Sequence, residues 1–130
     1  MIFPKGEKQI ENFNGTCFMN FLVDDSDGNH YNTVIDVYFE PGAHNSWHLH
    51  PHGQVLLVTE GEGIYQEKGK TSRFLKSGDV VKVPPNVIHF HGAMPNSDFT
   101  HIAVNPVTYN SAVVWLEPLS EAEYANAINR

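Results

Sequence analysis

Hydrophobic and polar positions alternate along most of the chain in short runs that Gly, Pro, Asn and Asp residues interrupt. In the run 33–40, Ile35, Val37 and Phe39 occupy every second position and would share one face of a strand. Comparable runs predict strands over 16–23, 33–40, 46–59, 64–67, 73–75, 80–83, 87–91, 99–104 and 113–116. Short strands every ~8–12 residues are typical of an all-β sandwich or barrel.

The interruptions between these runs predict turns. They fall at 41–42, 60–63, 68–70, 76–79 and 84–86. The segment 60–63, Glu-Gly-Glu-Gly, is expected to be a hairpin turn. The Asp-rich stretch 24–29 is expected to be a solvated loop, because no Glu follows at the spacing that an EF-hand calcium loop requires. His30 is expected to lie in the same loop.

The two ends of the chain differ from the strand-rich middle. Residues 1–15 are polar and predict an extended arm. Ser120 and Glu123 fit a capping box at the start of a short helix, with Leu119 as the apolar residue before the cap. The expected organisation is an arm over 1–15, a β-barrel over 16–118 and a helix over 119–130 that packs on the barrel exterior.

Composition and charge limit the kinds of partner that the protein can bind and indicate its cellular location. The 130 residues carry a formal net charge of −7 and contain no Lys/Arg run, which makes nucleic acid or an anionic membrane a poor partner. The single Cys17 excludes an internal disulfide bond. No stretch approaches the ~20 apolar residues of a membrane span, and the N-terminus lacks the apolar core of a signal peptide. We expect a cytoplasmic protein.

Histidine is unevenly distributed, since seven of the eight residues lie between His44 and His101. If the segment around His48 is a strand, then His48, His50 and Gln54 share one side of it. Two imidazoles at this spacing can grip one metal ion, and further ligands must come from Gln54 or from the second cluster, His89 and His91. We therefore expect a small β-barrel with one divalent metal site.

Two stretches resemble the two motifs of the cupin superfamily. Their residues are Gly42, His48, His50, Gln54 and Gly61 in the first stretch and Gly78, Pro84, Asn86 and His89 in the second. The resemblance implies a single-domain cupin fold, a double-stranded β-helix or jelly-roll-like barrel. The metal ligands that it implies are His48, His50, Gln54 and His89. Gln54 stands where the family usually has Glu, and Asn86 where it usually has Gly.

A narrower resemblance joins residues 35 to 124 to a branch of small bacterial cupins that includes manganese-dependent hydroxynitrile lyases. It is carried by the segments 47–54, 89–93, 100–103 and 115–117, together with 123–124. This resemblance implies that His101 is a general base and that Asn105 stands in for a glutamine that assists it. It also implies that Asn45 lines the pocket. The alternative for His101 is a hydrogen-bonded residue that only fills the barrel.

Other residues are expected near the pocket on strand parity alone. His91 shares the parity of His89, and His52 is expected at the rim, whereas Trp47 and Trp115 are interpreted as packing residues. The candidates for an apolar pocket wall are Ile35, Val37, Phe39, Leu56, Val58, Phe90 and Met94.

The function expected from these features is a metal-dependent enzyme acting on a small carbonyl or hydroxylated substrate, by lyase chemistry similar to cyanohydrin cleavage. A metal-dependent oxygenase or a decarboxylase-type cupin is an alternative, and a non-catalytic cupin that binds a small ligand is another. Manganese or iron is favoured over zinc, nickel and copper. The extended arm can add a strand to the sheet edge of a neighbour, so a homodimer is expected.

Overall fold

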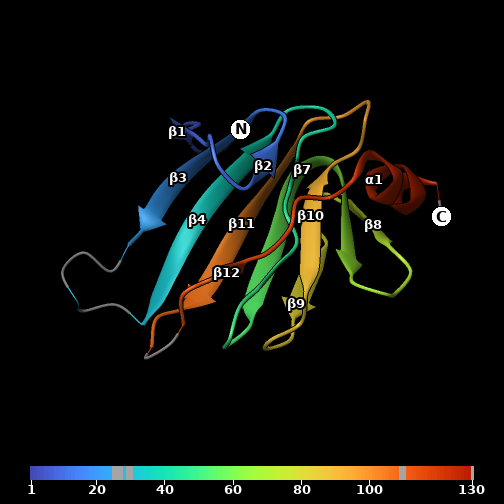
Figure 1. Ribbon diagram of the computed structural model, residues 1–130. Coiled ribbons are helices and arrows are strands. Elements are labelled where there is room, and N and C mark those ends of the chain that lie inside the picture. The colour runs from blue at the N-terminus through green and yellow to red at the C-terminus, as the bar shows by residue number, and fades with distance from the viewer. Residues whose placement is uncertain (25–27, 29–30, 109–110, 130) are drawn as a thin grey trace.

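The computed structural model describes residues 1–130 except 25–27, 29–30, 109–110 and 130 (Figure 1). Strands dominate the described part of the chain, and a helix follows near the C-terminus. The elements are β1 (Glu7–Lys8), β2 (Phe13–Asn14), β3 (Cys17–Val23), β4 (Asn32–Phe39), β5 (His44–Asn45), β6 (His48–Leu49), β7 (Gln54–Glu67), β8 (Arg73–Lys76), β9 (Val80–Val83), β10 (His89–Ala93), β11 (Phe99–Pro106), β12 (Val114–Trp115) and α1 (Glu121–Ile128).

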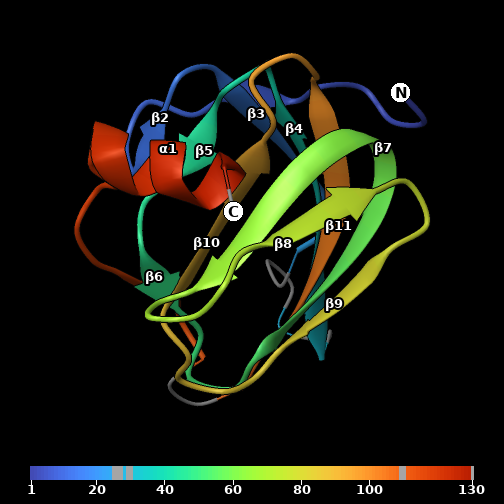
Figure 2. The ribbon, with the colours of Figure 1, turned by 90° about the vertical axis from the view of Figure 1, so that its right-hand side faces the viewer.

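The strands form a curled, antiparallel barrel with two faces, which Figures 1 and 2 show from two sides. One face, the β4 sheet, has the order β1-β3-β4-β11-β7-β9. The other, the β10 sheet, contains β8, β7, β10, β5 and β2, and it also includes β6 and β12. Because β7 belongs to both faces, it joins them, and the all-β barrel expected from the sequence is confirmed.

The expected turn over 60–63 is wrong, because β7 continues through it without reversing. Its first part pairs with β11 and β9, and its second part pairs with β10 and β8. The glycines serve close approach instead of a hairpin. Gly61 has a φ of 77°, and a Cβ atom there would collide with the carbonyl oxygen of Asp98. Glycine occurs both in hairpin turns and where a strand bends from one sheet to another. The local sequence of 60–63 therefore does not distinguish the two structures.

The expected continuous strand over 46–59 is also wrong, because the chain breaks between His50 and Gly53. The N–H of Gly53 donates a hydrogen bond to the carbonyl oxygen of His50 (3.0 Å), and Gly53 has a φ of 84°. Pro51 lacks the N–H that a strand ladder needs. Consequently β6 ends at Leu49 and β7 begins at Gln54. The predicted strand 64–67 is the second end of β7, and the other predicted strands are found within two residues of their expected ends.

The inner face of the β4 sheet is built from aligned rows of side chains. Phe21 pairs with Ile35, Ile35 with Ala103, and Ala103 with Leu56, so one row crosses β3, β4, β11 and β7. The next row on the same face contains Met19, Val37, His101 and Val58. Most of these apolar residues belong to the buried core between the two sheets, as the alternation along 33–40 predicts.

The C-terminal helix lies on the outer side of the β10 sheet (Figure 2). The capping box is present: Ser120 Oγ accepts from the Glu123 N–H (3.0 Å), and Glu123 Oε1 accepts from the Ser120 N–H (2.8 Å). Tyr124 donates its hydroxyl to the carbonyl oxygen of Ala93 (2.7 Å). Apolar residues of the helix end and of the barrel wall share a second buried cluster: Trp47, Ile64, Phe90, Leu119 and Ala127.

The N-terminal arm pairs with its own barrel. β1 pairs with β3 and β2 pairs with β5, both antiparallel. The homodimer therefore stays a prediction, as does the division of the chain into arm, barrel and helix. Most of the expected loop 24–29, and His30, lie outside the described residues. Over the described ranges, no helix has the length and apolar character needed to cross a membrane.

Two glycines test the importance of the bend in β7. Gly61 and Gly69 both have positive φ (77° and 81°), but a Cβ at Gly69 would meet open space. We expect Gly69→Ala to cost about 1 kcal/mol of unfolding free energy from backbone strain alone. Gly61→Ala should cost at least about 3 kcal/mol, because the Asp98 backbone must also move. Urea denaturation of both variants measures the difference, and equal costs would contradict this account of the bend.

Candidate metal centre

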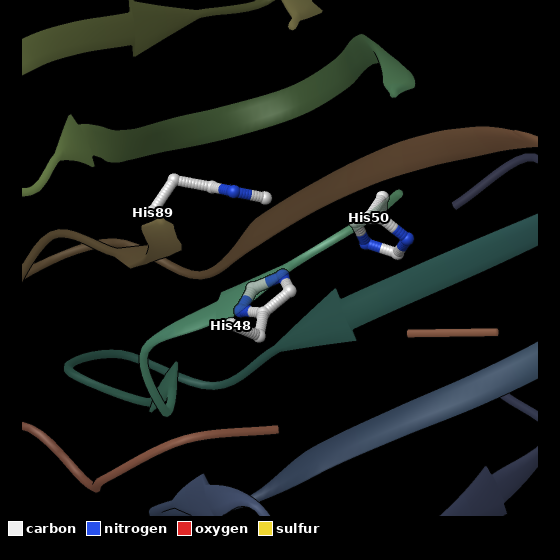
Figure 3. Close-up of side chains that lie close together, drawn as sticks. All are labelled: His48, His50 and His89. Carbon is white, nitrogen blue, oxygen red and sulfur yellow. The ribbon is translucent and has the colours of Figure 1, made fainter. Parts of the chain in front are cut away.

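Three histidines from two segments of the chain meet inside the barrel. His48 on β6 lies directly opposite His89 on β10, and His50 follows β6 at the start of the chain break. One ring nitrogen from each residue lies within 4.8 Å of the others. All three side chains are buried, and Figure 3 shows them gathered in one region between the strands. This cluster can hold a metal ion.

Backbone carbonyls fix two of these rings. His48 Nδ1 lies 2.7 Å from the carbonyl oxygen of Ser46, and His89 Nδ1 lies 2.9 Å from that of Val87. A carbonyl oxygen only accepts, so each Nδ1 carries the proton and each Nε2 keeps its lone pair. Hydrogen bonding of the non-ligating nitrogen is the usual support of a metal-binding histidine.

Gln54 reaches the same point from the first residue of β7. Its Oε1 lies 3.3 Å from His89 Nε2. Because the His89 proton is on Nδ1, two lone pairs face each other here, and a cation between them would turn this contact into an attraction. The donor set of His48, His50, His89 and Gln54 therefore fits a divalent ion, with the Gln54 amide oxygen as the fourth donor.

Burial keeps the cluster in the form that binds metal. It lowers the pKa of His50 and of His89 to about 4, and it lowers the pKa of His48 well below the ordinary value of 6.5. The rings are therefore neutral at pH 7, as metal ligation requires. Imidazole suits zinc, copper, iron and nickel, and an amide oxygen also admits manganese.

A second pair of imidazoles lies beside the cluster. His101 Nε2 is 3.0 Å from His91 Nδ1, and both rings are buried. Asn45 holds His91 in place, because Asn45 Oδ1 accepts from the backbone N–H of His91 (2.9 Å) and its amide nitrogen faces the His91 ring (3.3 Å). His101 Nδ1 is buried and has no hydrogen-bond partner among the described residues. Burial lowers the pKa of His101 to about 3, so this ring is neutral.

Asn105 lies apart from His101 along β11. They are four positions apart on the strand, about 13 Å at ~3.3 Å per residue. The Asn105 amide nitrogen donates instead to Thr33 Oγ1 (3.3 Å), its neighbour across the sheet. Asn105 Oδ1 is buried and has no hydrogen-bond partner among the described residues. The structure therefore brings His101 to His91 but does not bring Asn105 to His101.

A cavity of about 1040 Å³ opens onto both groups of imidazoles. Of the residues expected to form the pocket, Ile35, Val37, Asn45 and His91 line it. The cavity lining also contains His48, His50, Gln54, His101 and Asn105.

The expectation that Leu56 and Met94 line the pocket is not met. Leu56 is completely buried in the core between the sheets, beneath the cavity surface. Met94 follows the end of β10 and packs against the cluster under the C-terminal helix, on the outer side of the barrel wall. His52 is exposed and is not part of the metal-binding cluster, in line with its expected place at the rim.

Trp115 is a site residue that the sequence analysis interpreted as packing. It pairs with His48 across β12 and β6, and its indole ring lies 4.7 Å from the His48 ring at an angle of 37°. Trp115 also lines the cavity, with Thr33 and with residues 7–13 of the arm. Only the pairing of a two-residue strand places Trp115 here, and no sequence pattern indicates that pairing.

The family comparison agrees with this geometry. The cupin domain model matches residues 35–104, more than half of the chain, and this range contains the three clustered histidines and Gln54. The chain belongs to the cupin family. Cupins include both enzymes and proteins without catalytic activity, so membership does not decide the reaction.

Individual relatives were found among curated proteins and solved structures. The chain is 42% identical over 88 residues to an (R)-mandelonitrile lyase of Granulicella tundricola, which covers 68% of this chain and 67% of the relative. A cupin-like protein from Thermotoga maritima has a TM-score of 0.94 and 45% identity, covering 98% of this cupin and 96% of that chain. A conserved cupin barrel protein from Rhodopseudomonas palustris, at 16% identity, shares the fold with a TM-score of 0.72, over 92% of this chain and 79% of its own.

The buried imidazoles predict that acid destabilises the metal-free protein. Between pH 6.5 and 5 the unfolded chain binds protons on histidines that the folded chain keeps neutral, so the free energy of unfolding falls as the pH falls. His50 and His89, with pKa values of about 4, should each remove about 1.6 kcal/mol over this interval. Urea denaturation at the two pH values measures the loss, and His50→Gln should show a smaller one.

Trp115 predicts an optical signal for metal binding. A paramagnetic ion such as Co²⁺ or Cu²⁺ quenches the emission of an indole that lies against one of its ligands. We expect titration of the chelator-treated protein with Co²⁺ to quench tryptophan fluorescence, because Trp115 lies against His48. Trp115→Phe should remove most of the quenching, whereas Trp47→Phe should retain it. Equal quenching in the two variants would contradict the placement of the ion.

Proposed function

We propose that this cupin is a metal-dependent lyase that cleaves a small hydroxylated substrate of the cyanohydrin type, with His101 as the general base. The observation that carries the proposal is that His101, a neutral imidazole, lines the same cavity as the metal-binding cluster. The name of the relative from Granulicella tundricola supports the reaction class.

The proposed ligand set is electrically neutral. His48, His50 and His89 contribute neutral imidazoles and Gln54 an uncharged amide, so a divalent ion would keep its full charge. When bound, manganese or another divalent metal supplies Lewis acidity toward a substrate oxygen. The neutral set would strengthen this effect, because a glutamate in place of Gln54 would cancel part of the charge.

His101 would move the proton. One nitrogen of its neutral ring takes the hydroxyl proton of the cyanohydrin, the electron pair of that bond forms the carbonyl, and the carbon–carbon bond to cyanide breaks. The proton then passes from His101 to the departing cyanide, which leaves as hydrogen cyanide beside the aldehyde. His91 Nδ1 lies 3.0 Å from His101 Nε2, so the second imidazole can share the positive charge that His101 carries between these steps.

Removal of His101 tests the proposed base. His101→Asn should lower kcat for cyanohydrin cleavage by about 10²–10⁴-fold while the metal content stays unchanged. The matched control is His52→Asn, since His52 is exposed and is not part of the cluster. Elemental analysis and hydrogen cyanide release measure the two quantities. Full activity in His101→Asn would refute the base, and metal without any turnover in the unaltered protein would favour a non-catalytic cupin.

Gln54→Glu tests the charge of the ligand set. We expect the variant to retain its metal, since carboxylate oxygen is also a good ligand, and to lose at least about tenfold in kcat through the lower net charge. Elemental analysis and steady-state kinetics on the same preparation measure both effects. Unchanged kcat with unchanged metal content would contradict the argument from charge.

A further inference from the structure

The cavity extends well beyond the metal-binding cluster. Its lining runs across the inner face of the β4 sheet, from Gln54 on β7 past Asn105 and Ile35 to Phe21 on β3. These strands are consecutive neighbours in the sheet, so the floor spans three strand spacings, about 14 Å. The volume of about 1040 Å³ matches the upper end of the roughly 300–1,000 Å³ of pockets that hold drug-sized ligands.

The part of the floor farthest from the metal-binding cluster is apolar and open. Ile35 and Ala103 form its buried base. Phe21, which pairs with Ile35 across β3 and β4, is 51% exposed and also lines the cavity. An apolar surface that continues into a polar, buried centre is the usual form of a small-molecule site, whereas isolated exposed apolar residues need no explanation.

The charges around this part exclude an ionic ligand body. Among the cavity-lining residues that the structure describes, those with charged side chains at pH 7 are Glu7, Lys8 and Glu11, all exposed on the arm. No arginine and no buried lysine faces the floor within the described part of the lining. An anionic group would find a buried partner only at the metal centre, because the one lysine of this lining, Lys8, is exposed on the arm.

We propose that the outer part of the cavity, formed by Phe21 and its cross-strand partner Ile35, is a subsite for the uncharged, apolar body of a ligand whose polar end lies at the metal centre. The inference rests on the proposed function only in placing the polar end of the ligand at the metal centre. It implies that the substrate is longer than a single aromatic ring, because a single ring at the metal centre would leave the floor from β4 to β3 uncovered.

The unpartnered Asn105 Oδ1 suggests that the ligand carries a polar group between its end at the metal centre and its apolar body in the subsite. It is buried, belongs to a residue that lines the cavity, and is oriented by the hydrogen bond of its amide nitrogen to Thr33. A ligand O–H or N–H that donates to it would satisfy this acceptor. Asn105 would then select among ligands instead of assisting His101.

Two uncharged probes of different length test the subsite by isothermal titration calorimetry with the protein as purified. We expect 4-phenylphenol to bind at least about tenfold tighter than phenol, because its second ring buries apolar surface at Phe21 and Ile35. Phe21→Ser should reduce this advantage to less than about threefold and leave phenol binding unchanged. The charged analogue 4′-hydroxybiphenyl-4-carboxylate should lose the advantage as well.

A control variant keeps the test decisive. Val80 is 50% exposed, much like Phe21 at 51%, but it lies outside the cavity lining, so Val80→Ser should change the binding of neither probe. Equal affinity for phenol and 4-phenylphenol, or an advantage that survives Phe21→Ser, would overturn the subsite.

The outcomes for the subsite and for the reaction are separable. Cleavage of single-ring cyanohydrins without any preference for 4-phenylphenol would refute the subsite alone. A preference that depends on Phe21, in a protein without cyanohydrin cleavage, would refute the proposed reaction and retain the subsite.

Discussion

The pairing of β6 with β10 is the interaction on which the rest of the site depends. It places His48 directly opposite His89, although about forty residues separate them in the chain. β6 contains only two residues and cannot hold this position by itself. The C-terminal segment supports it: the Trp47 N–H donates to the carbonyl oxygen of Glu117 (3.0 Å), and the Leu116 N–H donates to that of Trp47 (2.8 Å). These hydrogen bonds of the C-terminal segment hold β6, which carries His48, against β10.

The C-terminal helix stabilises the same strands from the outer side of the barrel. Ser72 Oγ donates to the carbonyl oxygen of Ala127 (2.6 Å), and the Tyr124 hydroxyl donates to that of Ala93, the last residue of β10. Buried, satisfied hydrogen bonds of this kind are costly to break. The capping box and the apolar cluster around Trp47 therefore contribute to the metal centre indirectly, by fixing the strands that carry its histidines.

Burial has a second consequence inside the barrel. The ring centroids of His48, His89, His91 and His101 lie 4.2 to 5.7 Å from those of their neighbours. The rings are also shielded from water, so charging any of them is unfavourable. The same shielding that keeps the imidazoles neutral prepares the site for a cation from outside. The molecule joins a set of neutral donors to an apolar cavity floor, and this combination is suited to polarising one end of a largely uncharged ligand.

The sequence by itself determined the all-β class, most strand positions, the capped helix and the two histidine clusters, because alternation, capping residues and histidine spacing are local signals. The choice of Gln54 and His89 as ligands beside His48 and His50 came from the resemblance to the cupin motifs. The sequence misplaced the break at His50–Gly53 and the bend at Gly61, since glycine marks a turn, a bulge and a close approach alike. Tertiary structure alone decided that Trp115 lies against His48, that Asn105 bonds Thr33 and that the cavity reaches Phe21. These contacts join segments distant in the chain, and only strand pairing, which residue spacing does not encode, brings them together.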